Sequence, residues 1–299
     1  MPLRARFLVI VVGLMFASGA VRADTVPAWF VEPASLGDRS VATATAERGT
    51  QERLLPLPPP PYPGGFCDVV VPGMPGLAGP TGSARPVAYD LVGRSVEGRP
   101  ILAEYWGPAR PVRIVLVVGQ VHGNECSPTL VSDAIRRRPP SNVGIWLVPT
   151  LNPDGHAAYR RENANGVDLN ADGGMFSQPE TQALRDFVGR VRPSLTVHIH
   201  SPNGFAAAWP ATTGSSALAM CHSIADRTAI RCAGDAGSRS DRSRLFLWQG
   251  LAPFGGETLL VELHAVSDTE VPGARPRPAT RDIADVRADI DQVLIVVDQ

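Results

Sequence analysis

The sequence lacks a large net charge of either sign, since 28 lysines and arginines and 29 aspartates and glutamates leave a formal net charge of only -1. No overall electrostatic field therefore draws the chain to nucleic acid or to an anionic membrane surface. Beyond its first 23 residues the chain also lacks an apolar run long enough to cross a membrane. We accordingly expect no nucleic-acid partner and no stable membrane insertion.

The first 23 residues are typical of a cleaved secretory signal peptide. Arg4 and Arg6 form a positive start, residues 7–16 are apolar, and small residues at 21–23 give a cleavage site. The apolar run is too short to span a bilayer comfortably, and no cysteine follows the site to take a lipid. An uncleaved anchor is the alternative interpretation. We expect an exported protein, either periplasmic or secreted.

Residues 24–84 form a proline-rich N-terminal extension. The stretch at 55–63 is expected to be extended polyproline II, because each proline fixes φ and lacks a backbone donor. It could bind an aromatic groove, but a spacer or a strap over the next domain is the commoner role. Residues 85–299 then form the expected catalytic domain, with enough apolar residues for a sizeable core.

Four continuous apolar runs have the length of strands buried on both faces. Helical patterns lie between and after them. Strands that alternate with helices predict an α/β fold, with a mixed, mainly parallel central sheet and helices on both faces. The expected strands are residues 113–118, 143–148, 195–200 and 258–263, and the expected helices are 127–137, 179–191 and a last one from about 282.

Reactive side chains follow three of these expected strands. His122 comes after the first strand, His200 closes the third and Glu262 lies at the end of the fourth. Functional residues in such sheets gather beyond the carboxyl ends of the strands. We therefore expect these three side chains to meet at one edge of the sheet.

The segment at 120–125 places an imidazole, His122, and a carboxylate, Glu125, three residues apart on the turn that leaves a strand. Gly123 lets the backbone fold tightly, so that both side chains can face one ion. With His200 as a third ligand, one position stays open for water, which distinguishes catalytic zinc from structural zinc. We predict one zinc ion per chain.

Two other residues compete for a ligand role. His198 faces the same side of its strand as His200, but His200 is nearer the strand end, so we expect His198 to be a neighbour of the ligands. Cys126 directly follows Glu125, yet zinc bound by a single thiolate is unusual, and a buried or bridged cysteine is the commoner role. The four cysteines allow two disulfides, and we expect one between Cys221 and Cys232 because the loop is short.

In their order along the chain, these motifs resemble those of the zinc metallocarboxypeptidase family, which includes carboxypeptidase A-like enzymes and bacterial murein peptide amidases. The resemblance covers roughly residues 88–264. Its first segment, the lead-in at residues 92–101, and its P-E-T segment at 179–181 are closest to the amidase branch. The matching segments are 92–101, H-G-N-E at 122–125, 151–155, 161–170, 179–184, 198–201 and 261–263.

The resemblance implies a carboxypeptidase-like fold and roles for three more residues. Glu262 would be the general base that takes a proton from the metal-activated water. Arg161 would stabilise the oxyanion that develops on the scissile carbonyl, with Arg160 as the alternative. Asn170 would help to bind a substrate carboxylate.

The match to the family breaks after Asn170. There the family usually has an arginine that pairs with the terminal carboxylate of the substrate, whereas this chain has Ala171. Without that bidentate pair, anchoring of a free C-terminus should be weak. We hypothesise that Asp172 instead faces an amino group of the substrate, such as a diaminopimelate side chain offers. The alternative is a carboxylate anchor from Arg239, Arg242 or Arg244.

Together these features predict an exported zinc metallopeptidase, a carboxypeptidase or amidase that acts on peptides or muropeptides of peptidoglycan. An N-deacylase like aspartoacylase or succinylglutamate desuccinylase is one alternative, since it shares H-G-N-E and D-L-N, but the lead-in argues against it. A zinc-retaining peptide-binding protein with impaired catalysis is another. Glu262 and Arg161 argue against this, because a binding protein would not need both.

Overall fold

A single eight-stranded sheet organises the part of the chain that the structure describes. This structure is a computed structural model, and it describes residues 84–126, 128–201, 206–210, 216–233, 245–264 and 283–299. All of them belong to one unit, residues 56–299. The expected signal peptide, the proline-rich stretch and the three arginines at 239, 242 and 244 lie outside the described residues.

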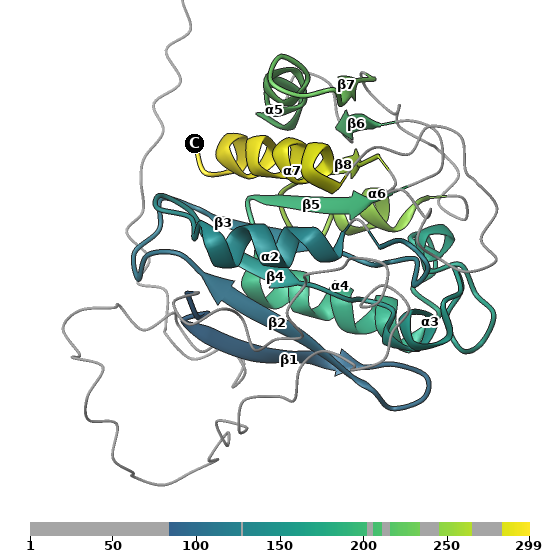
Figure 1. Cartoon of the computed structure of the whole chain (residues 1–299). Coiled ribbons are helices and arrows are strands. Elements are labelled where there is room, and N and C mark those ends of the chain that lie inside the picture. The colour runs from purple at the N-terminus through teal and green to yellow at the C-terminus, as the bar shows by residue number, and fades with distance from the viewer. Residues whose placement is uncertain (1–83, 127, 202–205, 211–215, 234–244, 265–282) are drawn as a thin grey trace, which may run out of the picture. The chain divides into compact units, whose positions relative to one another are not determined.

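The strand order is β1-β2-β4-β3-β5-β8-β6-β7 (Figure 1). The central strands are parallel: β3 pairs with β4 and β5, and β5 pairs with β8. Nearer the edges, β1 runs antiparallel to β2, β2 to β4, and β6 to β8. The expected mixed, mainly parallel sheet is confirmed. The strands are β1 (Ala88–Arg94), β2 (Pro100–Trp106), β3 (Ile114–Val118), β4 (Gly144–Val148), β5 (Leu195–His200), β6 (Ala207–Pro210), β7 (Arg231–Cys232) and β8 (Glu257–Glu262).

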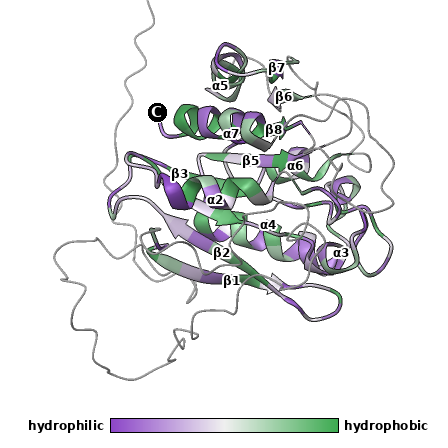
Figure 2. Ribbon diagram, in the orientation of Figure 1, coloured by the Kyte–Doolittle hydropathy of each residue, from purple (hydrophilic) through white to green (hydrophobic). Residues whose placement is uncertain are grey.

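Helices cover both faces of this sheet, as expected. Val115 and Val117 of β3 belong to a hydrophobic cluster that includes residues of α2, α5 and α7. The intervening Leu116 and Val118 face the opposite cluster, which includes residues of α4 and α6. The apolar and polar positions of these helices can be followed in Figure 2. The helices are α2 (Thr129–Arg137), α3 (Pro153–Ala158), the short η1 (Leu169–Asp172), α4 (Pro179–Val191), α5 (Ser216–Ala225), α6 (Leu247–Leu251) and α7 (Ile283–Val297).

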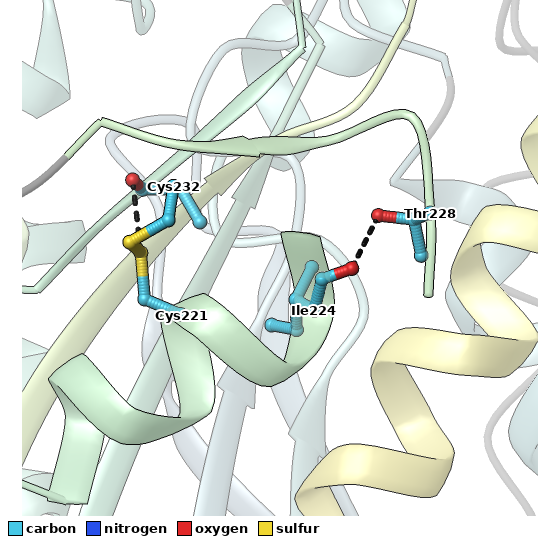
Figure 3. Close-up of a disulfide and its surroundings, with 5 residues drawn as sticks. Cys221, Ile224, Thr228 and Cys232 are labelled. Atoms are coloured by element: carbon cyan, nitrogen blue, oxygen red, sulfur yellow. Dashed lines mark hydrogen bonds between the residues drawn. A yellow bond between two sulfur atoms is a disulfide. The ribbon is translucent and has the colours of Figure 1, made fainter. Parts of the chain in front are cut away.

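The expected disulfide joins Cys221 of α5 to Cys232 of β7 (Figure 3). Between them the chain turns back, and the Thr228 hydroxyl donates to the Ile224 carbonyl at 2.7 Å. The bond thus fastens the outermost strand of the sheet to the helix beside it. None of the helices that the structure describes is both long enough and apolar enough to cross a membrane.

The carboxylate of Asp298, just after α7, holds the loop before β4. It accepts hydrogen bonds from the backbone N–H groups of Ser141, Asn142 and Val143 at 2.9–3.1 Å and from the Ser141 hydroxyl at 2.9 Å. Partial burial works against the charge, but these hydrogen bonds outweigh it and lower the pKa of Asp298. The charged form is therefore favoured in the folded state.

We expect Asp298→Asn to lower the free energy of unfolding by about 1 kcal/mol at pH 7, because an amide oxygen replaces the charged acceptor of a group that solvent still partly screens. The folded pKa is depressed, so this contribution is present above the unfolded pKa of about 4 and is lost as the pH falls through the folded pKa. Urea titrations of parent and variant at pH 7 and near pH 3 measure this. Asp291→Asn, at an exposed pair with Arg137, is the matched control. An equal loss at both pH values would contradict the assignment.

Candidate metal centre

The three residues expected to bind metal converge at the carboxyl edge of the parallel strands. His122 and Glu125 lie on the loop after β3, and His200 is the last residue of β5. All three are buried, and their potential ligand atoms lie within 4.8 Å of one another. His122 Nδ1 is 2.6 Å from Glu125 Oε1, and His200 Nδ1 is 3.2 Å from both His122 Nδ1 and Glu125 Oε2.

The turn between the two loop ligands needs Gly123 because of a close approach. A Cβ at this position would overlap the backbone of Gly155 and His156 in α3. α3 therefore packs directly against the ligand turn. The tight fold expected at Gly123 is present, and its cause is the proximity of α3 rather than a left-handed backbone, since φ is not positive there.

The donor set suits a zinc ion. Two imidazole nitrogens and a carboxylate face one another, and these are ligand types that zinc prefers. His200 Nδ1 faces His122 and Glu125. The other ring nitrogen of His200, Nε2, is buried and has no hydrogen-bond partner among the described residues. Glu125 also accepts a hydrogen bond from the Ser201 backbone at 3.1 Å, which orients its carboxylate.

Asp168 orients His122, and sequence reasoning missed this role. Its Oδ1 lies 3.1 Å from His122 Nε2, so it holds a proton there and leaves Nδ1 as the ring atom that faces Glu125 and His200. The residue stands in the D-L-N motif, two positions before Asn170. That proximity to the asparagine expected to bind substrate was the available signal, but it could not reveal which side chain Asp168 contacts.

The charges of this cluster support one another. Burial opposes a charge on His122, but the hydrogen bonds to Asp168 and Glu125 outweigh it and raise the pKa of His122 to about 9. Burial likewise opposes the charge on Glu125, and the neighbouring His200 and His122 nevertheless lower its pKa well below the usual range. The pKa of Asp168 is lowered in the same way by His122 and Arg161. Both carboxylates are therefore ionised and available to cations.

Both Arg161 and the alternative Arg160 are exposed, and Arg161 reaches the ligand cluster. The Nε and Nη2 atoms of Arg161 each lie 3.0 Å from Asp168 Oδ2, and its Nη1 lies 3.9 Å from Glu125 Oε1. Asp168 thus holds the guanidinium beside the proposed metal site. Because the Arg161 side chain is 45% exposed, it stays accessible to a substrate.

Glu262 ends β8 directly beside His200, its register partner in β5. Its Oε2 atom is buried without a hydrogen-bond partner among the described residues. Burial raises the pKa of Glu262 to about 7, and the charge of Glu125 adds to this against the opposing effect of His200. A perturbed carboxyl of this kind beside a candidate metal site is typical of a functional residue.

The two residues expected to bind substrate differ in their surroundings. Asn170 is buried, and its Oδ1 is an acceptor with no partner among the described residues. Asp172, in contrast, has both oxygens engaged at the start of α4. They accept from the Ser177 backbone and hydroxyl, the Gln178 backbone at 3.0 Å and the Thr181 hydroxyl at 2.5 Å.

The structure therefore gives Asp172 a different role from the hypothesis that it faces a substrate amine. A carboxylate at a helix N-terminus satisfies N–H groups that have no partner within the helix and is favoured by the helix dipole. With only 5% of Asp172 exposed, its charge is directed to α4 and not to a ligand.

The two competing ligand candidates lie apart from the cluster. His198 is fully buried one pleat further from the strand end, where its register partners are Val118 and Leu260. Burial, together with His200, lowers the pKa of His198 well below its ordinary value, so it is neutral. Cys126 is disulfide-bonded, and its sulfur is therefore not a thiolate ligand here.

Known proteins resemble this chain in parts of its sequence and in its fold. Murein peptide amidase A of Escherichia coli (strain K12) is 32% identical over 29% of this chain and 48% of its own length. Carboxypeptidase SOL1 of Arabidopsis thaliana is 28% identical over 28% of this chain and 22% of its own length. The chain thus spans less than half the length of either relative. No family model matches it.

Two solved structures decide the fold. The metallo-carboxypeptidase from Burkholderia cenocepacia superposes with a TM-score of 0.55 at 17% identity, covering 70% of this chain and 63% of that one. The murein-tripeptide amidase from Escherichia coli O157 superposes with a TM-score of 0.53 at 21% identity, covering 71% and 93%. The chain has a metallocarboxypeptidase-like fold. The resemblance inferred from the ordered motifs is confirmed, and in this metallocarboxypeptidase-like chain the ligand cluster lies where the central parallel strands end.

Proposed function

We propose that this chain is an exported zinc hydrolase that cleaves a peptide or amide bond in cell-wall peptides. The observation that carries the proposal is the convergence of His122, Glu125 and His200, with Glu262 beside them at the end of the next strand. The fold and the names of the relatives support the reaction class. Murein peptide amidase A and the expected secretory signal support the substrate class.

Each residue would have a defined task in this reaction. His122, Glu125 and His200 would hold the zinc ion, which when bound supplies Lewis acidity and lowers the pKa of water. Glu262 would accept a proton from the attacking water and pass it to the leaving amine. Arg161, held by Asp168, would donate hydrogen bonds to the carbonyl oxygen as negative charge develops on it.

Product analysis tests the proposed function. Purified, zinc-loaded protein would be incubated with muropeptides, ordinary peptides and N-acyl amino acids, and the products identified by mass spectrometry. Cleavage within the peptide part of muropeptides supports the proposal. Preferred release of the acyl group from N-acyl amino acids would favour the deacylase alternative. Tight binding of muropeptides without products would favour a zinc-retaining binding protein.

The chain should not depend on a free C-terminal carboxylate. Ala171 is exposed next to Asn170 and cannot pair with a carboxylate. We expect kcat/KM for a peptide and for its C-terminal amide to agree within about threefold, since a charge-assisted pair worth about 1.5–3 kcal/mol is missing. The measurement is a paired kinetic assay on free and amidated peptides.

The converse variant, Ala171→Arg, should introduce the missing recognition of a C-terminal carboxylate. A guanidinium at an exposed position should be tolerated, and we expect it to create a preference for the free C-terminus of roughly tenfold or more. If the parent chain already requires a free carboxylate, the anchor is supplied from elsewhere, and the prediction is wrong.

A further inference from the structure

Gln120 has an unusual backbone for its position in the ligand loop. It lies two residues before His122, is fully buried, and has a φ of 41°. A residue with a Cβ is disfavoured in this left-handed region. Such a conformation persists only where the surrounding structure determines it, and it is often found at functional sites.

The side-chain amide of Gln120 makes three buried contacts. Its Nε2 donates to the Glu125 carbonyl at 3.2 Å and lies 3.0 Å from His156 Nδ1. Its Oε1 accepts from the Thr150 hydroxyl at 2.7 Å. The amide therefore links Gln120 to the Glu125 backbone at the other end of the loop, and it also contacts His156 of α3 and Thr150, which follows β4.

Asn152 and α3 also contact the backbone of this loop. Asn152 donates through its backbone N–H to the Gln120 carbonyl at 3.1 Å and through its Nδ2 to the Val121 carbonyl at 3.3 Å. Gly123 lies against the backbone of α3. These contacts hold Gln120 in its left-handed conformation, which in turn places its amide under the Glu125 carbonyl.

We propose that Gln120 is a positioning residue that sets the spacing of His122 and Glu125 before a metal binds. The contact of its amide with the Glu125 carbonyl is to the loop backbone, and through this contact the residue would act on the ligands. Groups that fix metal ligands commonly affect metal affinity strongly. This inference rests on the proposed zinc site, and its test is separate from hydrolysis.

The test is Gln120→Gly, because glycine adopts a positive φ freely, so the variant removes the side chain with its amide and adds no backbone strain. We expect zinc affinity, measured by competition with a chromophoric chelator, to fall roughly 10- to 100-fold. The visible spectrum of the cobalt-substituted protein should also change, since it reports ligand geometry. The melting temperature of the metal-free protein should shift by only a few degrees.

Arg192→Gly is the matched control. Arg192 also has a positive φ, 46°, and ends α4 away from the ligand loop. This variant should keep the parental zinc affinity and cobalt spectrum. If Gln120→Gly also kept both, the positioning role would be refuted, whereas a parent protein without zinc affinity would refute the proposed function itself.

If Gln120→Gly does not fold, Thr150→Val is a second variant that tests the positioning role of Gln120. It removes only the hydroxyl that holds the Gln120 amide and keeps the side-chain shape. A several-fold loss of zinc affinity supports the positioning role, and an unchanged affinity overturns it.

Discussion

Glu262→Gln is expected to lower kcat/KM by roughly 100- to 10,000-fold while the protein still binds one zinc ion per chain. The amide keeps the size of the carboxyl but cannot accept a proton from water, and general base catalysis contributes about this factor. The residue lies beside His200 at the strand ends and is not one of the three converging ligands. Steady-state kinetics on a cleaved peptide and metal analysis of the same samples provide the two measurements.

Glu257→Gln is the matched control, because Glu257 lies at the opposite end of β8. Its carboxylate accepts hydrogen bonds from Ser216 and Ala217 at the start of α5, so its loss should affect stability and leave kcat/KM within about twofold, as expected for a change remote from the site. If Glu262→Gln retained full activity, the base would be another group. If it lost zinc together with activity, Glu262 would be a ligand.

The sequence predicted the centre of the sheet well and its edges poorly. The four expected strands overlap β3, β4, β5 and β8, because strands buried on both faces give continuous apolar runs. β1 and β2 gave no such run. Val92 is the only buried residue of β1, and in β2 buried residues such as Ile101 and Ala103 are separated by a partly exposed one. β7, with two residues, exists only through its pairing with β6.

The convergence of His122, Glu125 and His200 could be predicted because these residues combine a local spacing with the ends of strands that are recognisable from composition. Asp168 and Gln120 act through contacts that depend on how two loops fold against each other, and no spacing reveals these contacts. Asp172 is a second residue whose contacts could not be predicted from its position in the sequence. It stands close to Asn170 in sequence, yet the short η1 turns its carboxylate into the N-terminus of α4.

The second large effect is expected at the two histidines of β5, since only one of them should bind metal. His200→Ala should weaken zinc binding by at least about a hundredfold, because zinc sites gain roughly 10–16 kcal/mol from all of their ligands together. His198→Ala should keep zinc affinity within about tenfold, the range typical of a residue near the ligands. Chelator competition on both purified variants measures the difference.

This pair is informative because the two side chains face the same side of one strand and differ by a single pleat. His200 Nδ1 lies 3.2 Å from two other ligand atoms, whereas His198 is enclosed, with neither ring nitrogen hydrogen-bonded to a described residue. His198→Ala should therefore lower the free energy of unfolding, by about 1–3 kcal/mol for a cavity in the core, and spare the metal. If zinc were instead lost only in His198→Ala, the metal ligand of β5 would be His198 and not His200. The proposed metal centre would then be wrong.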